Sequence, residues 1–364
     1  MRILVVNAGS SSLKLRVIEP DDRLSGSLDL PAPRGVLDRA ALPDAIRGLG
    51  AVDAVGHRIV HGGTAFSQPV RLTPEVVGRL EALTDLAPLH QPKSLAALAA
   101  VTATLPEVPA VACFDTAFHA AMPAAAATYA LPPEWRRRWE LRRYGFHGLS
   151  HAYASRRAAG LLGRSVEQLR IVTCHLGAGA SLTAVLGGRS VDTTMGFTPL
   201  EGLVMATRSG SVDPGLVLWL EEHVGMPPAE LAATLEHRSG LAGLAGTPDL
   251  QAILAGEAAG DGDAGLAVAV YLHRLRGAIA AMAAAMDGLD ALVFTGGVGE
   301  NSAPIRSRAA AGLGFLGVAV DAAANEGGRV DREIGASGAA VRTLVVAARE
   351  DLQIAREVRA VLGT

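Results

Sequence analysis

"RILVVNAGSSSLKLRVI", residues 2–18, decides how the chain begins to fold. Two apolar runs, 2–7 and 14–18, flank a short stretch of small residues, a pattern that predicts a β-hairpin. The turn region collects small polar side chains and one ammonium group, those of Asn7, Ser10, Ser12 and Lys14. Such donors beside a glycine suit phosphate oxygens, but an ordinary Gly-Ser hairpin has the same composition. Both interpretations stay open at this point.

The second half of the chain repeats this design. The run 171–177, the small-residue turn 178–181 and one returning strand over 182–191 predict a second hairpin. A further apolar run, 291–297, ends in glycines and precedes a helix expected over 304–311. Two hairpins of one design predict a duplicated α/β fold, with the turns facing a cleft between two domains.

Helical patterns alternate with these strands, which predicts mixed or parallel sheets covered by helices. The expected helices span 74–86, 93–104, 147–162, 213–223 and 264–286. The length of 364 residues also favours two domains. With 33 basic against 36 acidic residues the net charge is −3, so no summed field attracts nucleic acid or an anionic membrane. Small-molecule partners are the expectation.

The two cysteines indicate a reducing environment. Cys113 and Cys174 each lie in an apolar run and have no partner at metal or redox spacing, so we expect buried thiols and a cytoplasmic protein. The first residues lack the pattern of a signal peptide. The alanine-rich stretch 264–286 is interrupted by His273 and Arg274, so we expect a packed helix and no membrane span.

Several polar residues stand where an apolar strand predicts none. In "HRIVHGG" Arg58 lies within a strand, where a lone guanidinium is costly unless it meets an anion or a structural carboxylate. In "VACFDTAFH" Asp115 follows an apolar strand, the position from which α/β folds project catalytic groups, although a helix cap is the alternative. "TRSGSVDPG" carries Arg208 just before an expected helix start. Two guanidiniums suffice to clamp a carboxylate and a transferring phosphoryl group.

Two more segments carry candidate ligand groups. "YGFHGLSH" places His147 and His151 four residues apart, but no acidic third ligand follows at metal-site spacing. We therefore interpret His147 as a phosphate donor and His151 as a packing residue. "FTGGVGENSAPIR" reads as a strand, a glycine turn and a helix start suited to a nucleotide, although by itself this match is weak.

Taken together, these motifs resemble the acetate kinase family, in family order from residue 7 to residue 302. They are "NAGSSSLK", "GHRIVHGG", "FDTAFH", "YGFHGLSH", "HLGAGAS", "MGFTPLEGLVMATRSGSVDPG" and "FTGGVGENS". The resemblance implies the duplicated ribonuclease-H-like fold of sugar kinases, heat-shock chaperones and actin. It divides the chain into 1–117 plus 350–364 and 118–349. It also implies phosphoryl transfer between ATP and acetate, giving acetyl phosphate and ADP, with Mg²⁺ or Mn²⁺, and a homodimer.

The resemblance also implies a role for individual residues. Arg58 and Arg208 hold the acetate carboxylate and stabilise the transferring phosphoryl group, and His147 binds the oxygens of that group. Asp115 orients or deprotonates the acid or positions the metal, and His90 supports the site. The metal residues are Asn7 and Glu350. The nucleotide and phosphate residues are Ser10, Ser12, Lys14, His175, Gly177, Gly179, Asp249, Gly296, Gly297, Gly299, Glu300 and Asn301. The pocket for the acyl methyl group comprises Val60, Leu89, Phe146 and Pro199.

The sequence departs from the family pattern at the nucleotide segments. Ala178 stands where the family usually has Asn, which removes one amide donor and about 1 kcal/mol of binding. Leu250 and Gln251 stand where Phe and Arg are usual, and Arg349 where Asn is usual. A pyrophosphate-dependent variant and a non-catalytic nucleotide-binding module therefore stay open. So does a propionate or other short-chain acyl kinase, because one methylene is worth only about 1–3 kcal/mol in discrimination.

Overall fold

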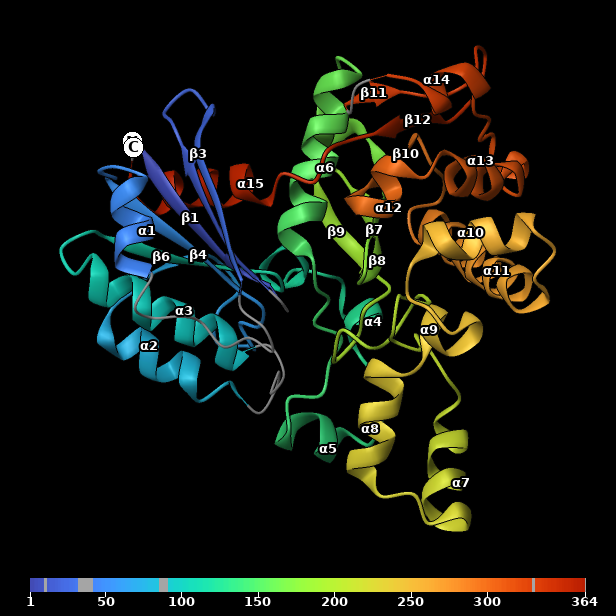
Figure 1. The fold of residues 1–364 in the computed structure, drawn as a ribbon, viewed down its shortest axis with the longest axis horizontal. Coiled ribbons are helices and arrows are strands. Elements are labelled where there is room, and N and C mark those ends of the chain that lie inside the picture. Colours follow the sequence, from blue (N-terminus) through green and yellow to red (C-terminus); the bar gives the residue numbers. More distant parts are fainter. Residues whose placement is uncertain (10–11, 32–41, 85–90, 329–330, 364) are drawn as a thin grey trace. The chain divides into compact units, whose positions relative to one another are not determined.

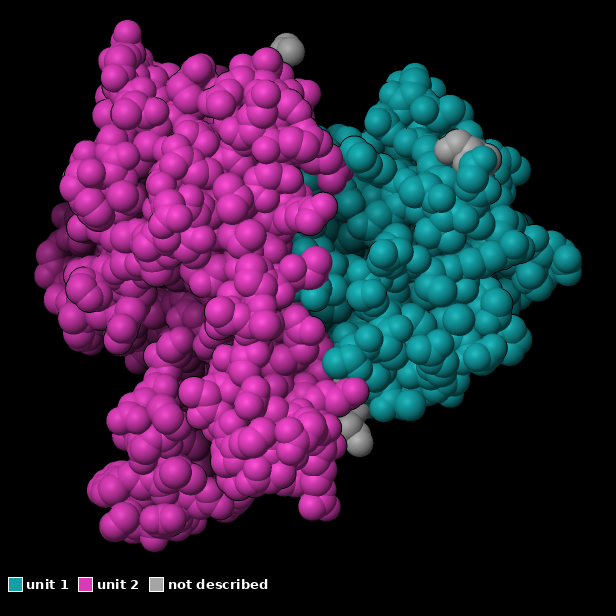
Figure 2. Space-filling model, turned by 180° about the vertical axis from the view of Figure 1, so that it is seen from behind, with its two compact units in different colours: residues 1–120, 146–153, 349–364 teal, residues 121–145, 154–348 magenta. Residues whose placement is uncertain are grey.

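The computed structural model describes residues 1–9, 12–31, 42–84, 91–328 and 331–363. The chain divides into two compact units, which Figure 2 shows in different colours. Unit 1 comprises residues 1–120, 146–153 and 349–364, and unit 2 comprises residues 121–145 and 154–348. Unit 1 therefore takes up the short segment 146–153 in addition to the two ends of the chain.

Unit 1 is built on a six-stranded sheet in the order β3-β2-β1-β4-β6-β5. The first three strands form an antiparallel meander, β1, β4 and β6 run parallel, and β5 pairs antiparallel with β6 at the edge. The strands are β1 (Ile3–Ala8), β2 (Ser12–Ile18), β3 (Leu24–Pro31), β4 (Ala54–Ile59), β5 (Val70–Arg71) and β6 (Ala110–Phe114). The hairpin expected from residues 2–18 is thus β1 and β2.

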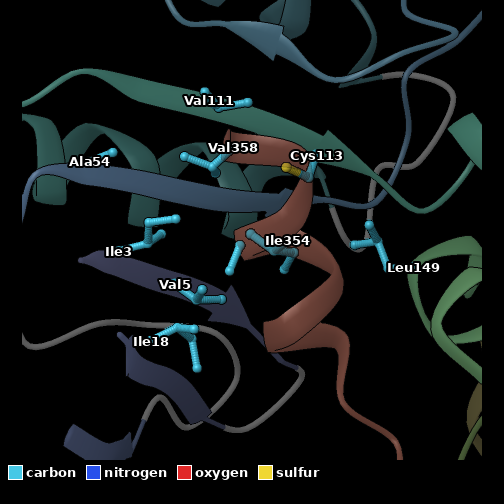
Figure 3. Close-up of a cluster of buried hydrophobic side chains, with 10 residues drawn as sticks. Ile3, Val5, Ile18, Ala54, Val111, Cys113, Leu149, Ile354 and Val358 are labelled. Atoms are coloured by element: carbon cyan, nitrogen blue, oxygen red, sulfur yellow. The ribbon is translucent and has the colours of Figure 1, made fainter. Parts of the chain in front are cut away.

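Both faces of this sheet are buried, since alternate residues of β1 enter two different cores. Leu4 and Val6 pack with residues of α1 (Leu42–Gly48) and α3 (Gln91–Thr104). Ile3 and Val5 pack on the opposite face, against α15 (Glu350–Leu362), as Figure 3 shows. Helix α2 (Pro74–Glu81) belongs to a third cluster beside β6. The C-terminal helix therefore completes the core that the first strand begins.

Unit 2 repeats this topology, with the sheet order β11-β12-β10-β7-β8-β9. Again three antiparallel strands precede parallel ones, and a short antiparallel strand closes the edge. The strands are β7 (Arg170–Leu176), β8 (Ala180–Leu186), β9 (Arg189–Thr193), β10 (Ala291–Thr295), β11 (Arg332–Glu333) and β12 (Arg342–Val345). The predicted duplication is confirmed.

The single returning strand predicted over 182–191 is wrong. It is two strands, β8 and β9, because Gly187 and Gly188 adopt φ values of 59° and 77° and turn the chain back on itself. Positive φ at two successive residues is the requirement of a tight hairpin turn, and glycine meets it without strain.

Figure 1 labels the helices of unit 2, of which α7 and α8 lie away from its sheet. The helices of this unit are α4 (Ala124–Ala127), α5 (Pro133–Arg138), α7 (Pro214–Val224), α8 (Pro228–His237), α9 (Gly240–Ala245), α10 (Leu250–Ala258), α11 (Gly262–Ala284), α12 (Gly296–Asn301), α13 (Ala303–Ala311) and α14 (Ala322–Glu326). Helix α6 (Gly148–Leu161) begins in unit 1 and ends in unit 2.

Helix α11 is long and apolar enough to cross a membrane by length and composition alone. It nevertheless packs as a core helix, because Val268, Leu272, Leu275 and Ile279 form one buried stripe at helical spacing. Elements that it contacts include β7, β8, α9, α10 and α13. The packed helix expected over 264–286 is therefore present, with its start two residues earlier.

Candidate functional site

The carboxyl ends of three neighbouring strands in unit 1 bring polar residues to one edge of the sheet. Val6 of β1 pairs with His57 of β4, so the next residue of each strand, Asn7 and Arg58, lie side by side. Asp115 directly follows the last residue of β6, which pairs in parallel with β4. Parallel neighbours end at the same edge of a sheet, where α/β folds bind their ligands.

Hydrogen bonds join these side chains into one chain of contacts. Arg58 donates to both carboxylate oxygens of Asp115, Nε to Oδ1 at 2.9 Å and Nη2 to Oδ2 at 2.6 Å. Arg58 Nη1 donates to Asn7 Oδ1 at 3.1 Å, and Asn7 Nδ2 donates to Glu350 Oε2 at 2.9 Å. Glu350, the first residue of α15, lies 3.9 Å from Arg58 Nη1. We call Asn7, Arg58, Asp115 and Glu350 the polar cluster.

Burial makes the electrostatics of the polar cluster strong. The side chains of Arg58 and Asp115 are 16% and 2% exposed. Burial opposes the charge of Arg58, but the negative charges of Asp115 and Glu350 outweigh it and raise the pKa of Arg58, so the guanidinium stays protonated. Burial raises the pKa of Asp115 above its ordinary value, with Arg58 pulling the other way. The two pKa values are linked through one bidentate ion pair.

The segment 146–148 adds to the same edge of unit 1. Gly148 N donates to Asp115 O at 2.9 Å, and the main chain of His147 hydrogen-bonds the Asp115 carboxylate. His147 adopts a φ of 57°, an uncommon conformation for a residue with a side chain that often marks a functional position. A Cβ on Gly148 would lie 2.2 Å from Asp115 O, so only glycine permits this close approach.

The remaining residues predicted for unit 1 lie as follows. Phe146 is buried, and its carbonyl oxygen lies 3.0 Å from His119 Nε2. Val60, the residue after β4, is also buried. Lys14 is exposed and pairs in register with Asn7, and Ser12 O closes the hairpin by accepting from Gly9 N at 2.8 Å. The predictions for Ser10, Leu89 and His90 fall outside the described residues.

Unit 2 holds a pocket of about 650 Å³ beside the ends of β7 and β10. One side comes from the β7–β8 turn, with Gly177 and Ala178, and from α12, with Gly297 and Asn301. Another comes from Asp249 and the start of α10. Apolar side chains, among them Leu241, Leu250 and Leu254, dominate the remaining wall. A mostly apolar wall with a few polar groups is typical of small-molecule sites.

The glycine turn after β10 is shaped by a close approach. Gly296 has a φ of 79°, and a Cβ there would lie 2.8 Å from Leu176 O. Glu300 Oε1 accepts from Gly296 N at 3.1 Å and from Ala348 N at 2.9 Å. Five of the predicted nucleotide residues lie within two positions in sequence of a pocket-lining residue but are not part of the pocket wall. They are His175, Gly179, Gly296, Gly299 and Glu300. These assignments stay predictions.

Arg208 belongs to unit 2 and is held by an ion pair. Its Nε donates to Glu236 Oε1 at 2.7 Å, and its Nη1 donates to Pro199 O at 3.5 Å. Both charged side chains are largely buried. Arg58 lies in unit 1, so the joint action of the two guanidiniums stays a prediction.

The comparisons with known proteins decide the family. The model of the acetokinase family matches residues 37–356. Acetate kinase of Synechococcus sp. is 45% identical over 399 aligned residues, covering 98% of either chain, and that of Gloeobacter violaceus is 51% identical over 308, covering 84% of this chain and 76% of that one. The chain belongs to the acetokinase family. It is therefore a phosphotransferase that acts on a carboxyl group.

Solved structures agree with this membership. The acetate kinase of Porphyromonas gingivalis superimposes with a TM-score of 0.90 at 37% identity, covering 99% of both chains. A propionate kinase from Francisella tularensis gives a TM-score of 0.90 at 35% identity, covering 98% of both. The duplicated fold expected from the resemblance is that of the acetokinase family.

Sequence reasoning missed some residues at these sites. Glu236, which orients Arg208, follows it by 28 positions at the end of α8, where no local pattern marks a buried carboxylate. Tyr271 and Ala206 line the pocket, but Tyr271 lies in the apolar stripe of α11 and is indistinguishable from a core residue in the sequence. Only the three-dimensional structure shows that these residues lie at the two sites.

The donor set of the polar cluster fits a partial magnesium site. Within the described part of the chain, no three His, Cys, Asp or Glu side chains gather as a complete cage. Mg²⁺ is usually held by one or two carboxylates plus substrate phosphates and water, so a complete cage is not required. Glu350 supplies a carboxylate, and Asn7 an amide oxygen, at the same strand edge. Hard oxygen ligands of this kind suit Mg²⁺ or Mn²⁺.

Proposed function

We propose that this chain is an acetate kinase, which transfers the γ-phosphoryl group of ATP to acetate reversibly and gives acetyl phosphate and ADP. The observation that carries the proposal is the polar cluster, in which one largely buried guanidinium is oriented by Asp115 and Asn7 at the strand edge. Family membership and the 45% identity to an acetate kinase over nearly the whole chain support it.

Arg58 has donors left for a substrate. A guanidinium carries five N–H groups, and Asp115 and Asn7 engage three of them. The two that remain are on Nη1 and Nη2, the adjacent atoms that bind a carboxylate or phosphoryl group bidentately. Asp115 and Asn7 thereby fix the fork before the substrate arrives, which lowers the entropy cost of positioning.

The other residues of unit 1 divide the remaining tasks. Glu350 and Asn7 would hold Mg²⁺, which neutralises charge on the phosphate oxygens when bound. His147 is proposed to donate to the transferring group, and Phe146 and Val60 to contact the acyl methyl group. In-line displacement at phosphorus asks for positioning and charge neutralisation and needs no covalent enzyme group. This set of residues supplies both.

Unit 2 is proposed to bind the nucleotide. The mostly apolar wall of its pocket suits a nucleobase, which pyrophosphate lacks, and a volume of about 650 Å³ lies in the range of small-molecule sites. Arg208, oriented by Glu236, is assigned by the family resemblance to the carboxylate and phosphoryl groups. ATP is therefore the favoured phosphoryl donor over pyrophosphate.

Acyl hydroxamate formation tests this proposal. Purified protein with hydroxylamine and Mg²⁺ receives ATP or pyrophosphate, together with acetate, propionate or butyrate. We expect the highest kcat/KM with ATP and acetate, and a fall of about 10- to 200-fold for each mismatched methylene in a fitted pocket. Absence of product with every donor would overturn the kinase assignment, and product with pyrophosphate alone would overturn the choice of ATP.

Propionate kinase is the second candidate. The similar Francisella tularensis structure is a propionate kinase, at 35% identity. Higher kcat/KM for propionate than for acetate in the same assay would favour it. The acetate kinase relatives at 45–51% identity favour acetate.

The remaining expectations concern assembly and location. A homodimer follows from the family resemblance, and α7 is the face that we propose for it. Its residues Leu216, Leu218 and Trp219 are 48%, 56% and 51% exposed, an unusual apolar surface for a helix of a monomer. Cytoplasmic location is proposed because Cys113 and Cys174 are both free and buried.

A further inference from the structure

Unit 2 contains a buried guanidinium that the proposed reaction does not use. Arg306, in the first turn of α13, is 1% exposed. Removing a cation from water is costly unless its hydrogen bonds are satisfied and its charge is balanced. Within the described part of the chain, no carboxylate forms an ion pair with it. Glu326 attracts the charge of Arg306 and Arg332 repels it, but neither makes an ion pair or hydrogen bond with it among the described residues, so other groups must supply its direct contacts.

Four neutral oxygens hold the guanidinium, three of them backbone carbonyls. Arg306 Nη1 donates to Gly299 O and Glu300 O, both at 2.9 Å. Nε donates to Asn325 Oδ1 at 2.8 Å and Nη2 to Asn325 O at 2.7 Å. Four of the five N–H groups of Arg306 are thus satisfied, each by a neutral oxygen.

These oxygens share one property: they lie at helix C-termini. Gly299 and Glu300 are in the last turn of α12, and Asn325 is in the last turn of α14 (Figure 1). The last carbonyls of a helix have no partner within the helix and carry the negative end of its dipole. Burial lowers the pKa of Arg306 to about 10, so it stays a cation at neutral pH. The guanidinium therefore binds carbonyls at both helix ends, and Arg332 shares the end of α14 by donating to Ala324 O at 3.1 Å and Asn325 O at 3.2 Å.

Of these two helices, α12 forms part of the nucleotide pocket. Gly297, Val298 and Asn301 line the pocket from this helix, and Ser302 and Pro304 line it from the residues that follow. A helix of six residues has few hydrogen bonds of its own to fix its direction. Asn325 strengthens the same junction by donating from Nδ2 to Ala303 O at 2.9 Å. The wall of the pocket thus depends on contacts made at the C-terminal end of α12.

We propose that Arg306 is a positioning residue for the nucleotide site: it clamps the C-terminal carbonyls of α12 and so keeps the pocket wall formed by Gly297, Val298 and Asn301 in place. It does not touch the nucleotide itself. The inference rests on the proposal that this pocket binds ATP and ADP. Its consequence is an effect on nucleotide affinity that leaves acetate affinity unchanged.

Full-length Arg306→Ala, Arg306→Lys and wild-type protein are compared for the Kd of Mg-ADP by calorimetry and the KM values of ATP and acetate. We expect Arg306→Ala to raise the Kd of ADP and the KM of ATP by about tenfold or more, with the KM of acetate changed less than twofold. Arg306→Lys keeps the charge but not the fork, so an intermediate effect is expected. Low-millimolar guanidinium ion, which fits the space left by the side chain, should partly restore nucleotide affinity to Arg306→Ala.

Arg170→Ala is the matched control. Arg170 also makes multiple hydrogen bonds, to Asp290 and to Asp287 O, but at the opposite ends of β7 and β10. It should lower stability without raising the KM of ATP. Equal rises of both KM values in Arg306→Ala, or unchanged ADP binding by folded Arg306→Ala or Arg306→Lys, would overturn the inference. Wild-type protein that binds no ADP would instead overturn the proposed nucleotide site, and the inference with it.

Discussion

Arg58 meets Asp115 through two parallel hydrogen bonds, Nε to Oδ1 at 2.9 Å and Nη2 to Oδ2 at 2.6 Å. A fork-to-fork pair of this kind fixes the plane of the guanidinium as well as its position. The pair lies at the edge where β4 and β6 end, and Asn7 holds the third nitrogen. The orientation of Arg58 is therefore set by the protein before any substrate binds.

Replacing Arg58 by Lys should abolish most of the activity although the charge is kept, because an ammonium cannot contact Asp115, Asn7 and a substrate in one plane. We expect kcat to fall by about 10²–10³-fold, as for loss of one preorganised donor. Arg170→Lys changes an equally forked pair with Asp290 and serves as the control. An Arg58→Lys enzyme with wild-type kcat would show that the fork is dispensable.

The Asp115 carboxylate should set the acid limb of the pH profile. Burial raises the pKa of Asp115, so its protonation begins at a higher pH than for an ordinary aspartate and releases Arg58 from its bidentate pair. Activity should therefore fall on acidification through that raised pKa. Asp115→Asn should lower kcat about 10²-fold or more and remove this limb from the profile. If folded Asp115→Asn protein still lost activity on acidification as the wild type does, a group other than Asp115 would set the acid limb.

Acid should also destabilise unit 1 through its buried histidines. Burial lowers the pKa values of His57, His61 and His119 to about 4. The unfolded chain binds these protons near pH 6.5, so the stabilisation is complete above that pH and is lost as the pH falls to about 4. Within this window each histidine contributes about 1.4 kcal/mol per pH unit.

Urea unfolding of wild type and His57→Leu between pH 7.5 and pH 5 checks this, since His57→Leu removes one titrating group and should flatten the dependence. His57 Nε2 has no hydrogen-bond partner in the described part of the chain, so the leucine variant does not deprive another group of a hydrogen bond to this nitrogen. Identical slopes in the two proteins would exclude His57 as a source of acid lability.

Gly56 of β4 should tolerate no side chain. A Cβ there would lie 2.4 Å from Ile354 Cγ2 and 2.8 Å from Val358 Cγ2 of α15. Gly56→Ala should therefore lower the free energy of unfolding by about 1–3 kcal/mol through overpacking. Gly78→Ala in α2, where a Cβ meets nothing within 4 Å, should instead stabilise by about 0.5–1 kcal/mol. Denaturant curves that rank the two variants the other way would contradict the packing of α15 on β4.

The proposed dimer face should respond to a charge on α7. Trp219→Glu places a carboxylate in the exposed apolar surface of this helix, and we expect a shift from dimer to monomer in light scattering after size exclusion. Trp139→Glu is the control, because Trp139 is similarly exposed, at 48%, outside α7. A dimer that survives Trp219→Glu would place the interface elsewhere.

Much of the fold could be predicted because its signals are local. The alternation in β1 and the small residues of the first turn mark the hairpin, and the repeat of the design at 171–191 marks the duplication. The boundary between β8 and β9 could not be predicted from apolar periodicity, since the break depends on the left-handed conformations of Gly187 and Gly188. Apolar periodicity also misplaced a helix end: α2 ends at Glu81, not at residue 86, and Ala82 caps it in a right-handed conformation.

The site was predictable only in part. Arg58 and Asp115 stand out because a charge beside an apolar strand needs a partner, and the structure joins them in unit 1. Their bidentate geometry, the bridge through Asn7 to Glu350 and the role of Glu236 beside Arg208 involve separations of 28 to 343 residues, which no local pattern reports. Arg306 escaped notice because three of its four acceptors are backbone carbonyls, which are present at every residue.

The most direct test of the central claim is ³¹P NMR of purified protein with acetyl phosphate, ADP and Mg²⁺. The account predicts that the acetyl phosphate signal declines as the β-phosphate signal of ATP grows in equal amount, and that Arg58→Lys protein slows this by about 10²-fold or more. Acetyl phosphate that persists, or that yields only inorganic phosphate without ATP, would contradict phosphoryl transfer by this site.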